Sequence, residues 1–138
     1  MVLDDAPEKG RAEAGDDVEN AIVHQQDIQA VVNAMWAGGA EAMTIQGQRV
    51  ISTTGIKCVG NTVILHGVPY SPPYQISAIG DKDAMQRSLD DSRYVQGYLD
   101  YVDVWQLGWD VRDEDDIEAP AYDGSMEMRY ARAVPAGS

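Results

Sequence analysis

Glycine and proline residues divide one stretch of this chain, from Glu41 to Gly80, into short segments rich in Ile, Val and Thr. β-Branched residues favour extended backbone, whereas Gly, Pro and Asn favour the turns between strands. The turn residues fall at Gln46-Gly47, Gly60-Asn61, Gly67-Val68-Pro69 and Pro72-Pro73. The stretch therefore predicts a sheet of short strands, around which the rest of the chain must pack.

Five extended segments are expected within this stretch, at residues 42–45, 49–53, 56–59, 62–66 and 74–79. Gly60-Asn61 lies between two of them and is the sharpest hairpin signal in the chain. Gln46-Gly47 is expected to form a type II turn, with Gly47 at the position that needs a positive φ.

Helical periodicity appears on both sides of the expected strands. Apolar residues recur three and four positions apart between Asp27 and Ala37, so we expect an amphipathic helix that Asp27 caps and Gly38-Gly39 ends. Asp81 is expected to cap a short second helix, and a third helix follows it and ends at Gly108. Strand-like alternation then returns at Trp109 and again at residues 126–130.

The order of these elements is strand, helix, several strands, helix pair, strand, strand, if Val2-Leu3 is counted as the first strand. This order predicts an α+β fold with helices on one face of a mainly antiparallel sheet. A ferredoxin-like βαββαβ-type core with an extra hairpin accounts for it most economically.

The length of 138 residues suits a single domain, residues 1–138. Residues 6–20 consist of Gly, Ala and charged side chains without apolar periodicity, so we expect a flexible acidic loop there. Residues 134–138 are expected to form a frayed tail. The chain contains no Phe, and the large apolar volume must therefore come from Trp36, Trp105, Trp109 and the seven tyrosines.

The formal net charge of −13 makes the surface repel phosphate groups. Nucleic-acid binding and direct binding to a lipid surface are therefore disfavoured. Acidic charge of this size keeps proteins soluble, and an acidic recognition surface is the alternative interpretation. No apolar run approaches the ~18 residues that a membrane-spanning helix needs.

The residues that commonly carry catalysis or bind metals form no recognisable constellation. Cys58 is the sole cysteine, so it can form no intrachain disulfide and is expected to be a buried, inert thiol. His24 and His66 are the only imidazoles, which argues against a zinc site. The acidic run 113–116 lacks the spacing of a calcium-binding loop and is expected to be solvated. We therefore predict no metal, no cofactor and no enzymatic activity.

The best candidate for binding is the segment Tyr70-Ser71-Pro72-Pro73-Tyr74, together with Arg49. Two prolines remove N–H donors at the start of a strand, and the flanking tyrosines present amphipathic rings, which suits a binding edge of a sheet. The alternative is that the prolines merely protect a sheet edge from aggregation. We predict Arg49, Tyr70, Pro72, Pro73 and Tyr74 as the binding residues.

Several segments resemble one bacterial family, namely His24–Ala42, Ile45–Arg49, Gly60-Asn61, Ser71–Tyr74 and Ile79-Gly80. The resemblance spans nearly the whole chain and is to domain-of-unknown-function family 881, the YlxW/YlxX-like proteins of Gram-positive bacteria. It implies a domain that follows an upstream membrane-spanning helix and coiled coil and faces outward from the cell membrane. It also implies a gene that, in several Gram-positive bacteria, lies near cell-division genes. The family's usual Asn-Gly is Gln46-Gly47 here, so no ligand role of that Asn carries over.

Together these observations favour a non-enzymatic interaction domain of the cell envelope, which binds a protein partner or forms a homodimer. Contact with the membrane is expected only through the upstream anchor, and this chain itself is expected to be soluble. The alternative is a small-molecule-binding sensory domain, suggested by analogy with other ferredoxin-like domains. An enzyme is the third possibility.

Overall fold

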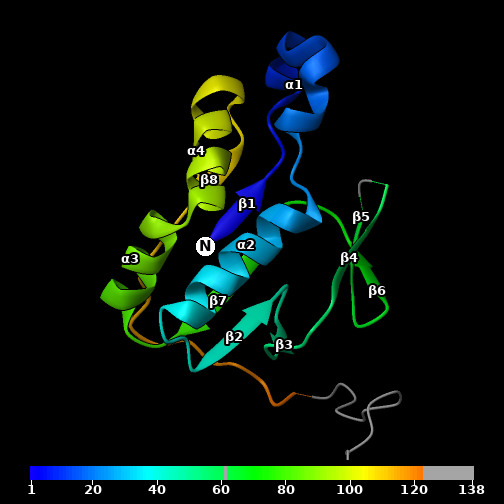
Figure 1. Cartoon of the computed structure of the whole chain (residues 1–138). Helices are drawn as coiled ribbons and strands as arrows, with labels where there is room; N and C mark the ends of the chain where they lie inside the picture. The colour runs from blue at the N-terminus through cyan, green and yellow to red at the C-terminus, as the bar shows by residue number, and fades with distance from the viewer. Residues whose placement is uncertain (61, 123–138) are drawn as a thin grey trace, which may run out of the picture.

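A five-stranded antiparallel sheet carries the architecture (Figure 1). The computed structural model describes residues 1–60 and 62–122, and the strand order is β3-β2-β7-β1-β8. The strands are β1 (Val2–Asp4), β2 (Ala42–Ile45), β3 (Gln48–Val50), β7 (Tyr74–Ile79) and β8 (Gly108–Asp110). Each strand pairs antiparallel with its neighbours. The expected α+β class and antiparallel sheet are therefore confirmed.

β7 is the middle strand of this sheet. It pairs with β2 over four residues, from Ala42↔Ile79 to Ile45↔Ile76, and with β1 through Leu3↔Tyr74 and its neighbour. The predicted sheet edge at residues 70–74 is therefore wrong for Tyr74, whereas Tyr70 does lie in an edge strand, that of the three-stranded sheet described next. Pro72 and Pro73 precede the first paired residue, so they remove no donor from the ladder.

A second sheet of three short strands follows the order β4-β5-β6. Its strands are β4 (Ile56–Val59), β5 (Thr62–Leu65) and β6 (Val68–Tyr70), which confirms the predicted hairpin around Gly60. At Gln46-Gly47, φ is 52° and 78°, and two positive values are typical of a type I′ turn. The predicted type II turn is therefore wrong, because the twist of a two-residue hairpin favours the primed geometry.

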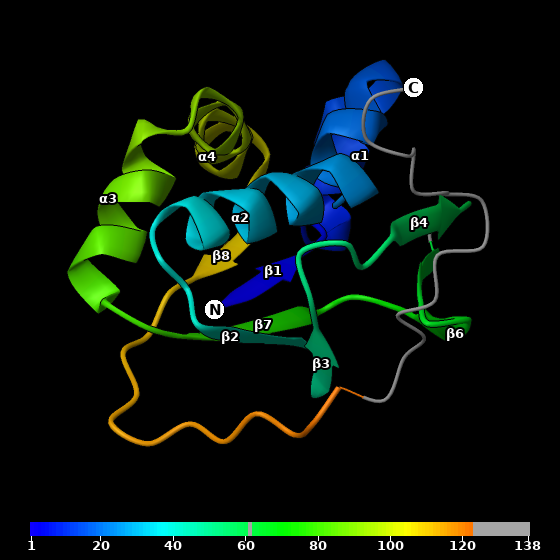
Figure 2. The ribbon, with the colours of Figure 1, turned by 60° about the horizontal axis from the view of Figure 1, so that its bottom comes forward.

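Three helices cover one face of the five-stranded sheet: α2 (Gln25–Ala37), α3 (Lys82–Asp91) and α4 (Arg93–Trp105) (Figure 2). Their buried side chains and those of both sheets form one hydrophobic core, whose largest members include Tyr74, Leu3, Ile28, Met43 and Leu65. No helix within the described ranges is long and apolar enough to cross a membrane. On the helix-free side, residues 111–122 run past the sheet and end beside β3 (Figure 2).

The first of these helices begins two residues before the predicted start. His24 is the N-cap residue, and its backbone N–H donates to Oδ2 of Asp27 at 2.7 Å. Asp27, the third residue of the helix, therefore accepts the hydrogen bond of the N-cap backbone N–H, as an acidic residue at this position commonly does. The predicted cap at Asp81 is confirmed, since its Oδ1 accepts from the backbone N–H of Ala84 at 3.0 Å.

The expected flexible loop at residues 6–20 is wrong, because this segment is mostly helical. It forms α1 (Glu8–Ala14) and the 3-10 helix η1 (Gly15–Ala21). Ala6, Ala14 and Ala21 are buried and pack against Trp105, at the end of α4. Small alanines give little periodic signal in the sequence, and their large packing partner comes from a distant helix. The strand predicted at 126–130 and the tail at 134–138 lie outside the described residues.

Two helical glycines are expected to respond to substitution in opposite ways, because Gly10 of α1 lies at the contact with α4 and Gly97 of α4 does not. A Cβ added at Gly10 would lie 2.4 Å from the backbone oxygen of Trp105, whereas one added at Gly97 would meet nothing within 4 Å. We expect Gly10→Ala to lower the free energy of unfolding by about 1–3 kcal/mol because of the clash. Gly97→Ala should raise it by about 1 kcal/mol, because Ala favours helix. Urea unfolding measures both, and a stabilising Gly10→Ala would contradict the packing of α1 on α4.

Candidate functional site

The β3–β6 corner, defined by Gln48, Arg49, His66 and Tyr70, is where the two sheets meet. The side-chain amide of Gln48 donates to the Tyr70 hydroxyl, and Oε1 of Gln48 lies 2.9 Å from Nδ1 of His66. One glutamine from β3 therefore links the five-stranded sheet to the three-stranded sheet. Gln48 and His66 were not among the predicted binding residues, because neither lies in a pattern that distinguishes it from an ordinary surface residue.

The β3–β6 corner holds an extended segment of the chain itself. Nη1 of Arg49 donates to the backbone oxygen of Pro120 at 3.1 Å. The rings of His66 and Tyr122 meet edge to face, with their centroids 5.6 Å apart. The Arg49 guanidinium thus contacts a backbone carbonyl, and the His66 imidazole contacts an aromatic ring two residues further along the same segment. This geometry is suited to holding extended peptide backbone together with an aromatic side chain.

Pro72 and Pro73, joined by a cis peptide bond, lead the chain from β6 into β7. Gln46 fixes this connection, since its Nε2 donates to the oxygen of Pro73 at 3.1 Å and its Oε1 accepts from the N–H of Gln75 at 2.9 Å. Pro73 is exposed beside the β3–β6 corner's strands. Two of the predicted binding residues therefore serve first to position the start of the middle strand.

Tyr74 lies in the hydrophobic core, with 1% of its surface exposed. Burial, followed by the nearby negative charge of Asp5, raises the pKa of Tyr74 to about 12. The side chain therefore stays neutral and packs in the interior. Of the predicted residues, Tyr70 contacts β3 through Gln48, and Arg49 of the same strand contacts Pro120. Tyr74 is buried in the core instead of lying at the surface.

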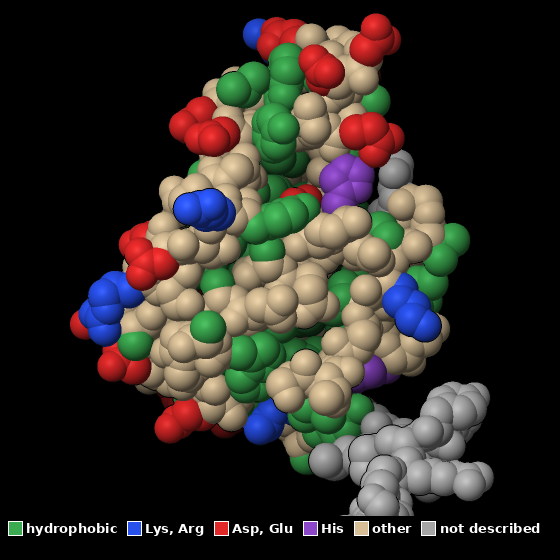
Figure 3. All heavy atoms as spheres, in the orientation of Figure 1, with side chains coloured by type: hydrophobic (Ala, Val, Ile, Leu, Met, Phe, Trp, Pro, Cys, Tyr) green, Lys and Arg blue, Asp and Glu red, His purple; other side chains and the backbone are tan. Residues whose placement is uncertain are grey.

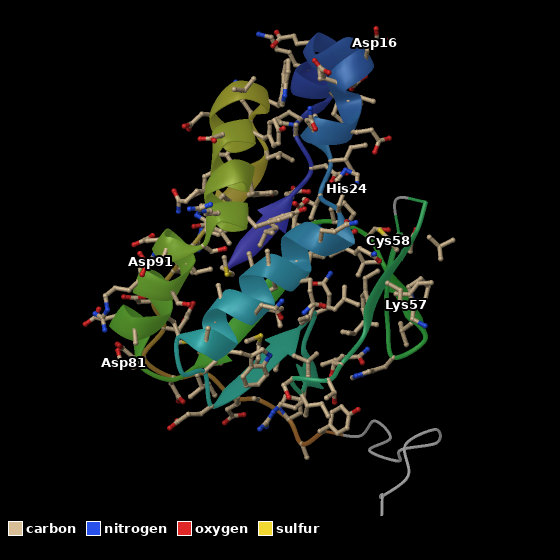
Figure 4. All side chains as sticks on the ribbon, viewed as in Figure 1. Asp16, His24, Lys57, Cys58, Asp81 and Asp91 are labelled. Atoms are coloured by element: carbon tan, nitrogen blue, oxygen red, sulfur yellow. The ribbon has the colours of Figure 1, made fainter. Side chains whose placement is uncertain are left out.

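A second polar cluster lies where α2 begins beside α4. Burial raises the pKa of Asp27, and the hydrogen bond from the His24 backbone opposes this shift. The Tyr94 hydroxyl is hydrogen-bonded to Asp27, and burial together with that carboxylate raises the pKa of Tyr94 to about 12. Figure 4 shows His24 at this end of α2, and its Nε2 lies 2.7 Å from the backbone oxygen of Glu19. The cluster ties α2 to η1 and α4.

The remaining candidates from the sequence carry no metal-binding geometry. Cys58 is half-buried rather than fully buried, and its Sγ lies 3.7 Å from the oxygen of Gly60 (Figure 4). The acidic run 113–116 is exposed, and Lys82 reaches Asp115 at 3.9 Å. Across residues 1–60 and 62–122, no three His, Cys, Asp or Glu side chains gather where they could hold a metal ion.

A cavity of about 520 Å³ lies between β7, α3 and the acidic segment. Apolar Ile79 and Met85, polar Ser77, and the carboxylates of Asp113 and Asp116 all contribute to its walls. Its size is within the range of small-molecule sites, which are typically lined mainly by apolar groups with a few polar ones.

The raised pKa of Asp27 predicts that the stability of the fold depends on pH. A carboxyl whose folded pKa lies above its ordinary value of 3.8 favours folding below that pH, and the contribution is lost as pH rises through the folded pKa. Asp27→Asn keeps an oxygen for the His24 N–H but cannot titrate. We therefore expect the wild type to lose stability relative to Asp27→Asn over that rise in pH. Urea unfolding at a series of pH values measures the difference, and a difference independent of pH would contradict it.

Comparison with known proteins places this chain among bacterial relatives. UPF0749 protein YlxW of Bacillus subtilis (strain 168) is 41% identical over 75 residues, which cover 54% of this chain and 32% of that protein. UPF0749 protein Rv1823 of Mycobacterium tuberculosis (strain ATCC 25618 / H37Rv) is 30% identical over 113 residues, which cover 82% of this chain and 36% of that protein. The chain thus spans about a third of the length of these curated relatives.

One solved structure has a similar fold. It is the crystal structure of an uncharacterized conserved protein from Mycobacterium tuberculosis, which matches with a TM-score of 0.66 and 24% identity over 96% of this chain and 85% of that one. The model of the family described as "Bacterial protein of unknown function (DUF881)" matches residues 1–132. As the sequence resemblance predicted, this chain belongs to that family.

Proposed function

We propose that this chain is a non-enzymatic interaction domain of a longer, membrane-anchored protein, and that it works by self-association or by binding a protein partner. The observation that carries the proposal is the β3–β6 corner, which holds residues 120–122 through Arg49 and His66. A surface that holds an extended segment of its own chain has the groups needed to hold one from another chain.

The setting that we propose is the outer face of the cell membrane, with a role connected to cell division. It rests on the family resemblance, and the length of the relatives leaves room for an anchor. We also infer a ferredoxin-like core made of β1, α2, β2, β7, the α3–α4 pair and β8. The order β2-β7-β1-β8 with antiparallel neighbours supports this assignment, with β3 added at the edge and β4–β6 as the inserted sheet.

A small-molecule sensor is the second candidate function, and the cavity beside β7 favours it. A thermal-shift screen against amino acids, nucleotides and cell-wall fragments tests it, because a ligand that binds the folded state raises the melting temperature. Stabilisation that Met85→Trp abolishes would support this function. A screen without any stabilisation would count against it.

Sedimentation equilibrium tests self-association through the corner. We expect Arg49→Ala and Tyr70→Ala each to weaken association by about tenfold, because each removes a contact group from the proposed surface. Arg87→Ala, at an exposed arginine of α3, is the matched control and should leave association unchanged.

Partner binding is tested in cells by a photo-cross-linking side chain at exposed Ser71, next to Tyr70. The proposal predicts a cross-link to a second copy or to a partner, reduced by Arg49→Ala. A wild-type chain that stays monomeric and forms no cross-link at Ser71 would contradict it.

A further inference from the structure

The exposed side of α4 carries an apolar stripe that the core does not use. Val95 and Tyr98 face the core, whereas Tyr94, Tyr101 and Val104 are 49%, 41% and 60% exposed. Their spacing of seven and three residues places them on one side of the helix. Figure 3 shows hydrophobic side chains forming a band that runs up the molecule between α4 and α1.

This stripe, which we call the α4 stripe, consists of Tyr94, Gly97, Tyr101 and Val104. It holds three of the six large hydrophobic side chains that are exposed in the described part of the chain. Gly97 lies in its middle, and a Cβ at that position would have open space around it. The backbone of a docked helix can therefore approach α4 closely there. Concentrated apolar exposure of this kind on one helix face marks a surface for another molecule.

Carboxylates border the α4 stripe on both sides. Asp100 lies on the surface of α4, three residues after Gly97 and four before Val104. Asp103 lies about one turn further along the helix. Across the band, α1 and η1 contribute exposed Glu13 and Asp16, and Figure 4 shows Asp16 at this end of the molecule. The packing of Trp105 against Ala6, Ala14 and Ala21 holds these two walls together.

Three basic residues belong to α1 and α4, namely Lys9 and Arg11 of α1 and Arg93 of α4, and they are fewer than the carboxylates. Arg93 is the first residue of α4, and Lys9 of α1 is 4.0 Å from Glu13. Figure 3 shows acidic side chains on both sides of the hydrophobic band. Such a surface repels anionic lipid headgroups. It also disfavours a second copy of this chain, because stacking two α4 stripes would bring Asp100 and Asp103 of both copies together.

We propose that the α4 stripe docks an amphipathic helix of a partner protein whose apolar face is flanked by Lys or Arg residues. The tyrosines and Val104 bury against the apolar face, Gly97 admits the helix backbone, and the carboxylates on both walls pair with the flanking basic groups. This is helix-in-groove recognition with electrostatic selection of the partner. The surface is separate from the β3–β6 corner, so it stands whether or not that corner binds a partner.

The test uses three fluorescent synthetic peptides of helical pattern: one with Leu on one face and Lys on the other, one with Glu replacing Lys, and one with Ser replacing Leu. Fluorescence anisotropy measures their affinity for the wild-type chain and its variants. We expect the Leu/Lys peptide to bind at least about tenfold more tightly than either of the other two. If the Ser/Lys peptide bound as tightly as the Leu/Lys peptide, binding would be unspecific charge attraction, and the proposal would be overturned.

Variants of the chain test whether the peptide binds at the α4 stripe. The double variant Tyr101→Ala, Val104→Ala should lose about tenfold in affinity for the Leu/Lys peptide, while Val59→Ala, an exposed valine of β4, should change nothing. Asp100→Asn with Asp103→Asn should weaken binding and flatten its dependence on salt. Wild-type affinity in the Tyr101/Val104 variant would overturn the proposal. So would self-association of the wild type that this variant abolishes, since the occupant would then be a second copy.

Discussion

The pairing of β7 with both β1 and β2 is the interaction on which the rest of this structure depends. β1 comes from the start of the chain and β2 follows α2, so β7 joins segments that are far apart in sequence. Tyr74 and Ile76 point from β7 into the core, and both are almost fully buried. A strand buried and bonded on both sides fixes its neighbours' register, because a one-residue slip would turn every core residue outward.

The pairing of β7 also decides which residues of the candidate site serve the fold and which remain available for binding. Tyr74 is held by the core, and Pro73 is held by Gln46, so both serve the sheet. Arg49 and Tyr70 lie on the other side of this connection, where Gln48 joins the two sheets. The β3–β6 corner and the α4 stripe are therefore two distinct surfaces on one rigid frame, and they suit different partners: an extended segment and a basic amphipathic helix.

Many of the strands and helices could be predicted from the sequence, because the patterns that indicate them are local. Alternation from Tyr74 to Ile79 and the periodicity of α2 identified these elements to within two residues. Alternation shows which face a side chain takes but not which strands lie beside its own, so Tyr74 was misplaced at an edge. The helix at residues 8–14 depends on Trp105, about ninety positions away, and no local pattern reports such a contact. The α4 stripe was not predicted from the sequence, because the exposure of its apolar residues becomes visible only when the packing of the helix is known.

Native-state hydrogen exchange measures the role of β7 most directly. Amides of β7 that bond to β1 or β2 should exchange only through global unfolding, with a free energy of opening equal to that of the whole domain. Amides of α1 and of residues 111–122 should open at lower free energy, because they contact the frame from outside. If the β7 amides that bond to β1 or β2 exchanged as readily as those of α1, the middle strand would not hold the fold together, and the central role of β7 would be contradicted.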